Sequence, residues 1–340
     1  MERWNIVNTV RSVNTLVAAR AFAIMIVVAN HSGFGISLHG GLNTLLVISG
    51  LMLAQFSFGE DTRVALRGMM RLGWRLAVPS FLIALVWQIG AGNLYLPELA
   101  FYSNWLGKSR VVLFPIWYAQ ALSQMLIALA LLFFVTDMGA RITRRPLFWT
   151  SLLYVISVAV ALYSYMIWDW TRYADKLPHL IAWNFVFGWL IWGTRNAQLG
   201  RAGKILLSCA LVATAVVVFL PLQADNGMTR AIVMPILVLP LIWFDRIKMP
   251  EVLARFVIII SQATLFIFFL HYFVFWALVK IGILTALDSE MQQPLLRLIA
   301  GVGGSCLIWA IWRSGLRVFR NKYRIWPLKR NIVRFRPQKV

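Results

Sequence analysis

Apolar runs recur along the whole chain, separated by short polar connections. Each has about 16–25 residues, the length that crosses a bilayer as an α-helix. The runs lack the period-2 alternation of barrel strands, and only helices or closed barrels satisfy their backbone in lipid. The pattern predicts an all-α polytopic bundle of about ten transmembrane helices, placed at 16–36, 41–58, 74–91, 112–135, 147–167, 178–193, 204–221, 229–245, 256–279 and 294–313.

Charge in the connections indicates the orientation of the bundle. Lys and Arg gather before the first run, in every even-numbered connection and after the last run. The odd-numbered connections hold fewer cations, mixed with acids. Because positive charge is retained on the inner side, we expect both termini to be cytoplasmic. We expect a multi-pass protein of the cell (inner) membrane, one domain over 1–340 with a basic cytoplasmic tail from about 314.

Composition excludes several other classes of protein. The chain is 60% hydrophobic and 13% charged, against roughly 25% charged residues in soluble domains. Its net charge of +21 therefore reflects orientation in the membrane, and no nucleic-acid partner is expected. Both cysteines fall inside apolar runs, so neither a disulfide framework nor a metal site is expected. Arg3 and Arg11 precede the first run without an A-x-A-like cleavage site, so this run is expected to remain as a helix.

Ionisable groups within a bilayer are costly, so those inside the predicted spans are candidates for function. Arg20 and His31 share the first span, eleven residues apart, which is about 16 Å along a helix. Eleven helical steps return to nearly the same face, so one stripe carries both side chains. His271, in the ninth span, lies at a similar depth. Two histidines facing one cavity would explain this, and so would a snorkelling arginine with structural histidines.

Two further polar patterns have alternative interpretations. Arg63, Arg67, Arg71 and Arg75 recur every fourth residue and so share one side of a helix. Such a row of guanidinium groups suits a polyphosphate ligand, but contacts with lipid headgroups would give the same pattern. At the start of the fourth span, Gln120 lies one turn from Trp117. The Gln120 side chain could line a cavity for a hydroxylated acceptor, or it could form an interhelical hydrogen bond.

These features, in this order, resemble the membrane-bound acyltransferase-3 family, whose members acylate carbohydrates, lipids and other acceptors. Arg20-x10-His31 matches the arginine–ten–histidine motif of its first helix. The stretch from Gly41 to Gly50 resembles its G-V-D-x-F-F-V-x-S-G pattern, and the stretch from Arg71 to Pro79 resembles its R-R-L-L-R-L-L-V-P segment. The residues from Trp117 resemble its W-x-L-x-x-E segment, and those from Thr264 to His271 its Y-L-x-H segment.

The chain departs from the family pattern at four positions. Asn43 stands where the family usually has an acid, and Leu72 replaces one arginine of its R-x-x-R pair. Leu122 falls near the usual glutamate of the fourth helix. Phe268 replaces the usual tyrosine before the late histidine. The departures indicate a divergent or specialised member, with an inactive member as the alternative.

The resemblance implies a membrane-bound O-acyltransferase dependent on acyl-CoA. It implies transfer of an acyl group, commonly acetyl, from cytoplasmic acyl-CoA to a hydroxyl of a carbohydrate, lipid or other envelope or secreted acceptor. His31 would be a general base or carry the acyl group, Arg20 would steady the donor, and Arg67, Arg71 and Arg75 would hold CoA phosphates. Acetyl-CoA would be a co-substrate, with no permanently bound cofactor. The residues expected to line the acceptor cavity are Asn43, Ser49, Trp117, Gln120 and His271.

A transporter or flippase of a lipid-linked or small polar substrate is the main alternative. Ion-coupled transporters usually carry carboxylates at mid-membrane and internal repeats. Here every Asp and Glu lies at a predicted helix end or in a connection, and no repeat is visible. A non-catalytic membrane scaffold is the third interpretation.

Overall fold

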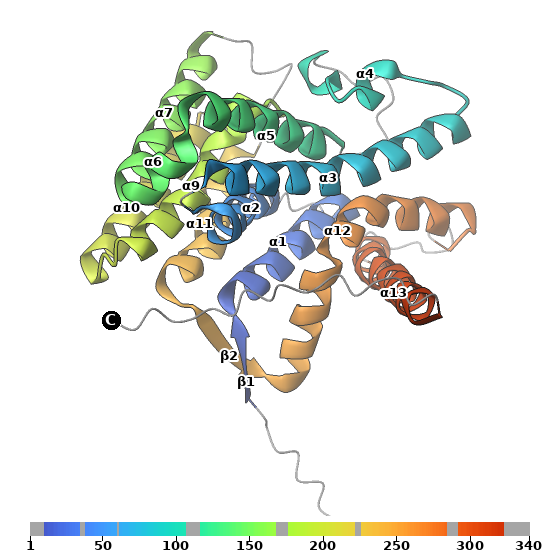
Figure 1. Ribbon diagram of the computed structural model, residues 1–340. Helices are drawn as coiled ribbons and strands as arrows, with labels where there is room; N and C mark the ends of the chain where they lie inside the picture. The colour runs from blue at the N-terminus through green and yellow to red at the C-terminus, as the bar shows by residue number, and fades with distance from the viewer. Residues whose placement is uncertain are drawn as a thin grey trace, which may run out of the picture.

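The computed structural model describes residues 10–34, 38–59, 61–106, 116–167, 176–221, 226–283 and 292–322. Within these ranges the predicted all-α polytopic bundle is confirmed, and seven helices are long and apolar enough to cross a membrane (Figure 1). Ten helices of 17 residues or more correspond to the ten predicted spans: α1 (Thr15–Ser32), α2 (Gly41–Ser57), α3 (Thr62–Gly90), α5 (Ile116–Thr136), α7 (Pro146–Ile167), α9 (Pro178–Asn196), α10 (Arg201–Phe219), α11 (Gly227–Trp243), α12 (Glu251–Lys280) and α13 (Gln292–Lys322).

Several helices extend beyond their apolar runs. α3 begins at Thr62, where the Asp61 side chain accepts from the backbone N–H of Arg63, rather than at 74. Its first turns carry arginines, which an apolar run does not include. Three short helices lie in the connections: α4 (Leu96–Leu99), η1 (Ser103–Leu106) and α6 (Met138–Arg144).

A two-stranded sheet was not predicted from the sequence. β1 (Val10–Asn14) pairs antiparallel with β2 (Arg246–Pro250), with Val10 opposite Pro250 and Asn14 opposite Arg246. β1 leads directly into α1, and β2 leads directly into α12. The sheet therefore joins the starts of two helices that are remote in sequence and pack side by side (Figure 1).

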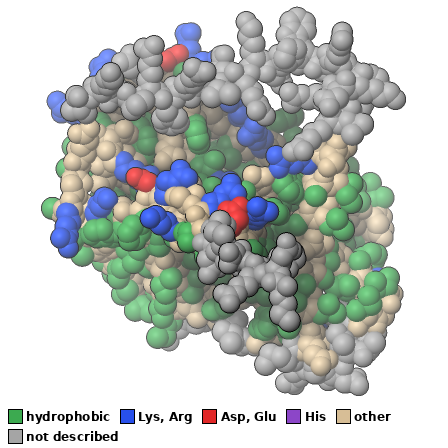
Figure 2. Space-filling view, turned by 90° about the horizontal axis from the view of Figure 1, so that it is seen from below, with side chains coloured by type: hydrophobic (Ala, Val, Ile, Leu, Met, Phe, Trp, Pro, Cys, Tyr) green, Lys and Arg blue, Asp and Glu red, His purple; other side chains and the backbone are tan. Residues whose placement is uncertain are grey.

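On the face that carries the sheet, the even-numbered connections meet one another. The Thr143 hydroxyl, after α5, donates to the carbonyl of Gly59, after α2, at 2.6 Å. Arg195, at the end of α9, pairs with Asp245, after α11, at 3.3 Å. Figure 2 shows Lys and Arg side chains gathered on this face. That this basic face lies in the cytoplasm stays a prediction from the charge bias.

The odd-numbered connections meet on the opposite face. The Asn226 side-chain amide, before α11, donates to Nε2 of His39, before α2, at 3.0 Å. The Asn104 amide donates to the carbonyl of Lys176, before α9, at 3.1 Å. These contacts agree with ten helices that each cross the membrane once. In such a bundle all even-numbered connections lie on one face and all odd-numbered connections lie on the other. We call this the outer face.

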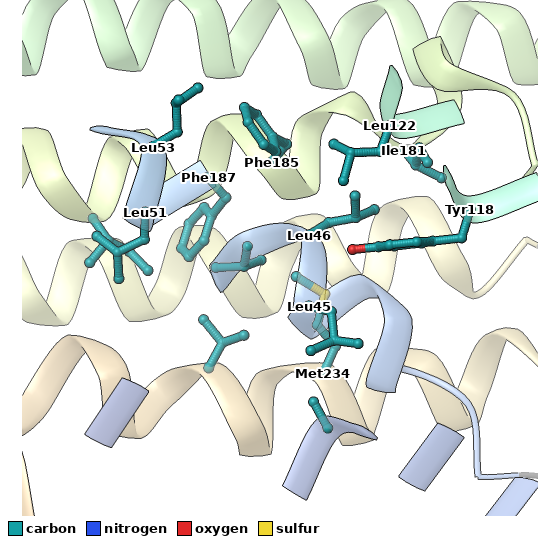
Figure 3. Close-up of a cluster of buried hydrophobic side chains, with 14 of the residues drawn as sticks. Leu45, Leu46, Leu51, Leu53, Tyr118, Leu122, Ile181, Phe185, Phe187 and Met234 are labelled. Atoms are coloured by element: carbon teal, nitrogen blue, oxygen red, sulfur yellow. The ribbon is translucent and has the colours of Figure 1, made fainter. Parts of the chain in front are cut away.

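The core of the bundle depends on a close approach of α2 and α9. A Cβ atom on Gly50 would lie 1.9 Å from the carbonyl oxygen of Phe185, and one on Gly188 would lie 2.2 Å from that of Val47. Small residues let helix backbones approach in a membrane, where packing replaces the hydrophobic effect as the driving force. Around this crossing, side chains of α2, α5, α9 and α11 form one buried cluster (Figure 3).

We predict that Gly50→Ala destabilises the bundle. The added methyl group meets backbone, which cannot rotate away, so α2 and α9 must separate. Overpacking of this kind costs about 1–3 kcal/mol of unfolding free energy. The thermal midpoint of the purified protein in detergent measures the loss. Gly303→Ala is the control, because its Cβ would meet no described atom within 4 Å. Equal midpoints for the two variants would contradict the predicted crossing.

Candidate functional site

Two histidines from distant helices meet near the outer face. His31 lies at the end of α1, half-buried, and His271 lies in α12 with 0% of its surface exposed. Nδ1 of His31 is 3.0 Å from Nε2 of His271, and the two ring planes are within 4° of parallel. The rings thus approach through facing nitrogens, with Tyr272 packed beside both at 4.8 and 4.4 Å between centroids. The structure brings together the two histidines singled out in the sequence.

The surrounding hydrogen bonds assign the protons of this pair. Nδ1 of His271 is 2.8 Å from the backbone carbonyl of Ile267. A carbonyl only accepts, so Nδ1 of His271 carries the hydrogen and its Nε2 has the lone pair. With both rings neutral, Nδ1–H of His31 donates to that lone pair. Nε2 of His31 is then left with its own lone pair, which is what a proton acceptor or nucleophile requires.

A cavity of about 240 Å³ opens beside His31 on the outer face. Two residues predicted to line an acceptor cavity, Asn43 and Trp117, do line it. Its other polar lining side chains were not predicted, and they are Asn30, His39, Lys176 and Arg230. Arg230 could have been found, because it is a cation inside the predicted eighth span. The others lie at helix ends or in connections, where polar residues are ordinary.

A second cavity, of about 500 Å³, lies on the basic face. Three arginines line it, Arg11, Arg20 and Arg246, together with Ser261 and Gln262. Arg20 also reaches α2, where its Nη2 contacts the sulfur of Met52. Arg11 and Arg246 come from the paired strands, so this cavity exists because β1 and β2 meet. Sequence analysis explained both only as orientation charge.

The arginine stripe of α3 lies elsewhere. Arg67, Arg71 and Arg75 are exposed and line neither of these two cavities. Nε of Arg67 donates to the carbonyl of Arg63, one turn earlier, at 3.3 Å. The regular spacing does produce a row along α3, and a phosphate-binding role for it stays a prediction.

Gln120 and Ser49 have partners within the protein. The Gln120 amide is fully buried, accepts from the Ser103 hydroxyl at 3.0 Å and donates to the carbonyl of Glu98 at 3.1 Å. It therefore holds the outer segment 98–104 to α5, the kind of structural hydrogen bond weighed as its alternative role. In that segment burial raises the pKa of the Glu98 carboxyl, which accepts from the Gln88 amide at 2.8 Å. The Ser49 side chain hydrogen bonds Tyr118 of α5.

The acyltransferase-3 family model, an acyltransferase domain, matches residues 14–313. The chain belongs to the acyltransferase-3 family. No curated protein and no solved structure matches it. Family membership makes the protein a membrane acyltransferase, which moves an acyl group from a donor to an acceptor, and it favours this reading over a transporter or scaffold.

In this acyltransferase one helix connects the two cavities. Along one stripe of α1, Arg20 lines the cavity of the basic face, and Val27 and His31 line the outer cavity. Between them stand Ala23 and Ile24, each with 0% of its surface exposed. About two turns of α1, from Arg20 to Val27, therefore separate the two cavities along this helix.

We predict that His31 and His271 are both neutral Nδ1–H tautomers in the acyltransferase at neutral pH. The ¹⁵N spectrum of ¹⁵N-histidine-labelled protein in bilayers measures this, with His31→Ala and His271→Ala variants assigning the signals. Removing His271 deletes the acceptor of the His31 hydrogen, so the His31 signals should shift toward those of free imidazole. An Nε2–H signal for His271 in the unmodified protein would contradict the assignment.

Proposed function

We propose that this acyltransferase moves an acyl group, most commonly acetyl, from cytoplasmic acyl-CoA to a hydroxyl of a carbohydrate or other envelope acceptor. His31 serves as the general base. The observation that carries the proposal is the His31–His271 hydrogen bond at 3.0 Å, which leaves Nε2 of His31 as an acceptor beside an outer cavity. The proposed setting is the inner membrane of the cell, with the basic face in the cytoplasm.

The reaction is a substitution at the thioester carbonyl. The acceptor oxygen bonds to the carbonyl carbon, and the bond from that carbon to sulfur breaks. Nε2 of His31 takes the hydroxyl proton and passes it to the sulfur of CoA. While His31 carries the proton, its Nδ1–H still donates to His271, which holds the ring in place as a positioning residue. Because a thioester is already activated, the proposal needs no metal.

The cavity on the basic face is the proposed entry for the donor. CoA is rich in phosphate, and guanidinium groups bind phosphate through paired hydrogen bonds. Arg11, Arg20 and Arg246 line that cavity, with Arg20 on the stripe of α1 that leads to His31. The exposed row of Arg67, Arg71 and Arg75 is a second candidate for these phosphates.

His31→Ala should lower acyl transfer by about 10²–10⁴-fold, the usual contribution of a general base. The measurement is acetyl transfer from [¹⁴C]acetyl-CoA in membranes with matched amounts of protein. His179→Gln is the control, because His179 packs on Trp105 at 5.6 Å between centroids and is not among the lining residues of the outer cavity. Full activity of His31→Ala would refute the mechanism. A hydroxylamine-sensitive label on unmodified protein would show an acyl-histidine intermediate instead.

Arg11→Gln and Arg20→Gln should each weaken acyl-CoA binding by about 10–100-fold, since a hydrogen bond to a charged group contributes about 1.5–3 kcal/mol. Calorimetry on purified protein in detergent gives the dissociation constants. Arg201→Gln is the matched control, an exposed cation outside this cavity. Parallel measurements on Arg71→Gln and Arg75→Gln decide the role of the α3 row. If Arg71→Gln and Arg75→Gln weaken acyl-CoA binding while Arg11→Gln and Arg20→Gln do not, the CoA phosphates bind to the α3 row instead of the cavity.

A further inference from the structure

The outer cavity is lined by positive charge from two separate elements. Arg230, in the first turns of α11, has only 6% of its surface exposed, and Lys176, just before α9, is exposed. Both line the cavity that holds His31. Among the described lining residues there is no Asp or Glu, and the remaining polar groups include the neutral amides of Asn30 and Asn43.

A site of this kind favours an anion over a neutral ligand. The guanidinium of Arg230 has five N–H donors, so it can give an entering anion a charge-assisted hydrogen bond in addition to the contact that it already makes. Arg230 sits on a helix and presents a planar fork, while Lys176 is a flexible point charge at the exposed edge. A neutral sugar hydroxyl would be bound equally well by amides and hydroxyls.

We infer that the acceptor of this acyltransferase is an anionic carbohydrate, bearing a carboxylate or phosphate ester near the hydroxyl that is acylated. Arg230 and Lys176 hold the anionic group and so present the neighbouring hydroxyl to Nε2 of His31. This inference rests on the proposed function, because it takes the outer cavity as the acceptor site. Donor phosphates are assigned to the opposite face, where Arg11, Arg20 and Arg246 line their own cavity.

Stabilisation of the oxyanion that forms on the thioester carbonyl is the competing role for Arg230. The two roles differ in one measurable respect. The oxyanion forms with every acceptor, so if Arg230 stabilises it, replacing Arg230 slows transfer to all acceptors equally. An anionic substituent is present only on some acceptors, so loss of its partner raises KM for those alone.

The in vitro test uses purified full-length protein, [¹⁴C]acetyl-CoA and three matched acceptors: octyl glucoside, octyl glucuronide and octyl glucoside 6-phosphate. We expect at least one anionic acceptor to exceed the neutral one by about tenfold or more in kcat/KM. Arg230→Met should raise KM for the anionic acceptor roughly 30-fold and leave KM for the neutral acceptor unchanged. This factor is at the lower end of the effect of removing one partner of a buried charge pair. A better neutral acceptor would overturn the inference, as would equal losses on all three.

Two further variants keep this test independent of folding. Asn43→Asp adds a carboxylate to the cavity with little change of shape, so it should selectively weaken the anionic acceptor. Lys280→Met removes a cation at the outer end of α12 that stacks on Trp276 at 5.8 Å and does not line the cavity. This variant should leave kcat/KM unchanged for both the anionic and the neutral acceptors. An Asn43→Asp protein that retains the full anionic preference would overturn the inference.

The natural acceptor gives a test that needs no choice of substrate. Cells carrying the active gene or His31→Ala are labelled with [¹⁴C]acetate, and surface material is depolymerised to fragments of one or two sugars. His31-dependent label retained on an anion exchanger supports the inference. His31-dependent label in the unretained, neutral fraction overturns it and leaves the proposed function standing. Absence of any His31-dependent label would refute the proposed function itself.

Discussion

Backbone groups inside a bilayer must find their hydrogen-bond partners within the protein, and the rest of this structure depends on that constraint. This constraint makes each apolar run a helix that crosses the membrane once, so alternate connections lie on the same face. The contacts Thr143–Gly59 and Asn226–His39 join such connections on opposite faces. A single helix can then present Arg20 to one compartment and His31 to the other. The separation of the two cavities, the proposed donor and acceptor sites, follows from the crossing of the helices alone.

The pairing of β1 with β2 determines which helices share the site. β1 continues into α1 and β2 into α12 from opposite ends of the antiparallel sheet, so both helices start on the same face of the bundle. His31 lies 16 residues after the start of α1 and His271 lies 20 residues after the start of α12, so the two side chains reach a similar depth. His31 and His271 are 240 positions apart in the chain and meet for this reason. The same pairing brings Arg11 and Arg246 to the cavity of the basic face.

Much of the fold was predictable because lipid imposes a simple length rule on apolar runs. Arg20 and His31 could be found because an ionisable side chain in an apolar helix is conspicuous. The sheet was not found, since five-residue strands between charged residues leave no periodicity. Lys176 and His39 lie where polar residues are expected, so nothing marked them. For Gln120 the spacing was read correctly, but only packing reveals that its amide binds the outer segment rather than the cavity.

The buried turn at Ala23 and Ile24 has a consequence for energetics. It separates the cavity of the basic face from the outer cavity with apolar side chains that have no exposed surface. In the proposed chemistry a proton leaves an acceptor on the outer side and departs on the CoA thiol on the inner side. The acyl group moves outward as this proton moves inward, and a neutral thioester and hydroxyl become a neutral thiol and ester, so no net charge crosses the membrane. The membrane potential therefore neither favours nor opposes this transfer, and the free energy of the thioester drives the proposed acylation of the outer surface.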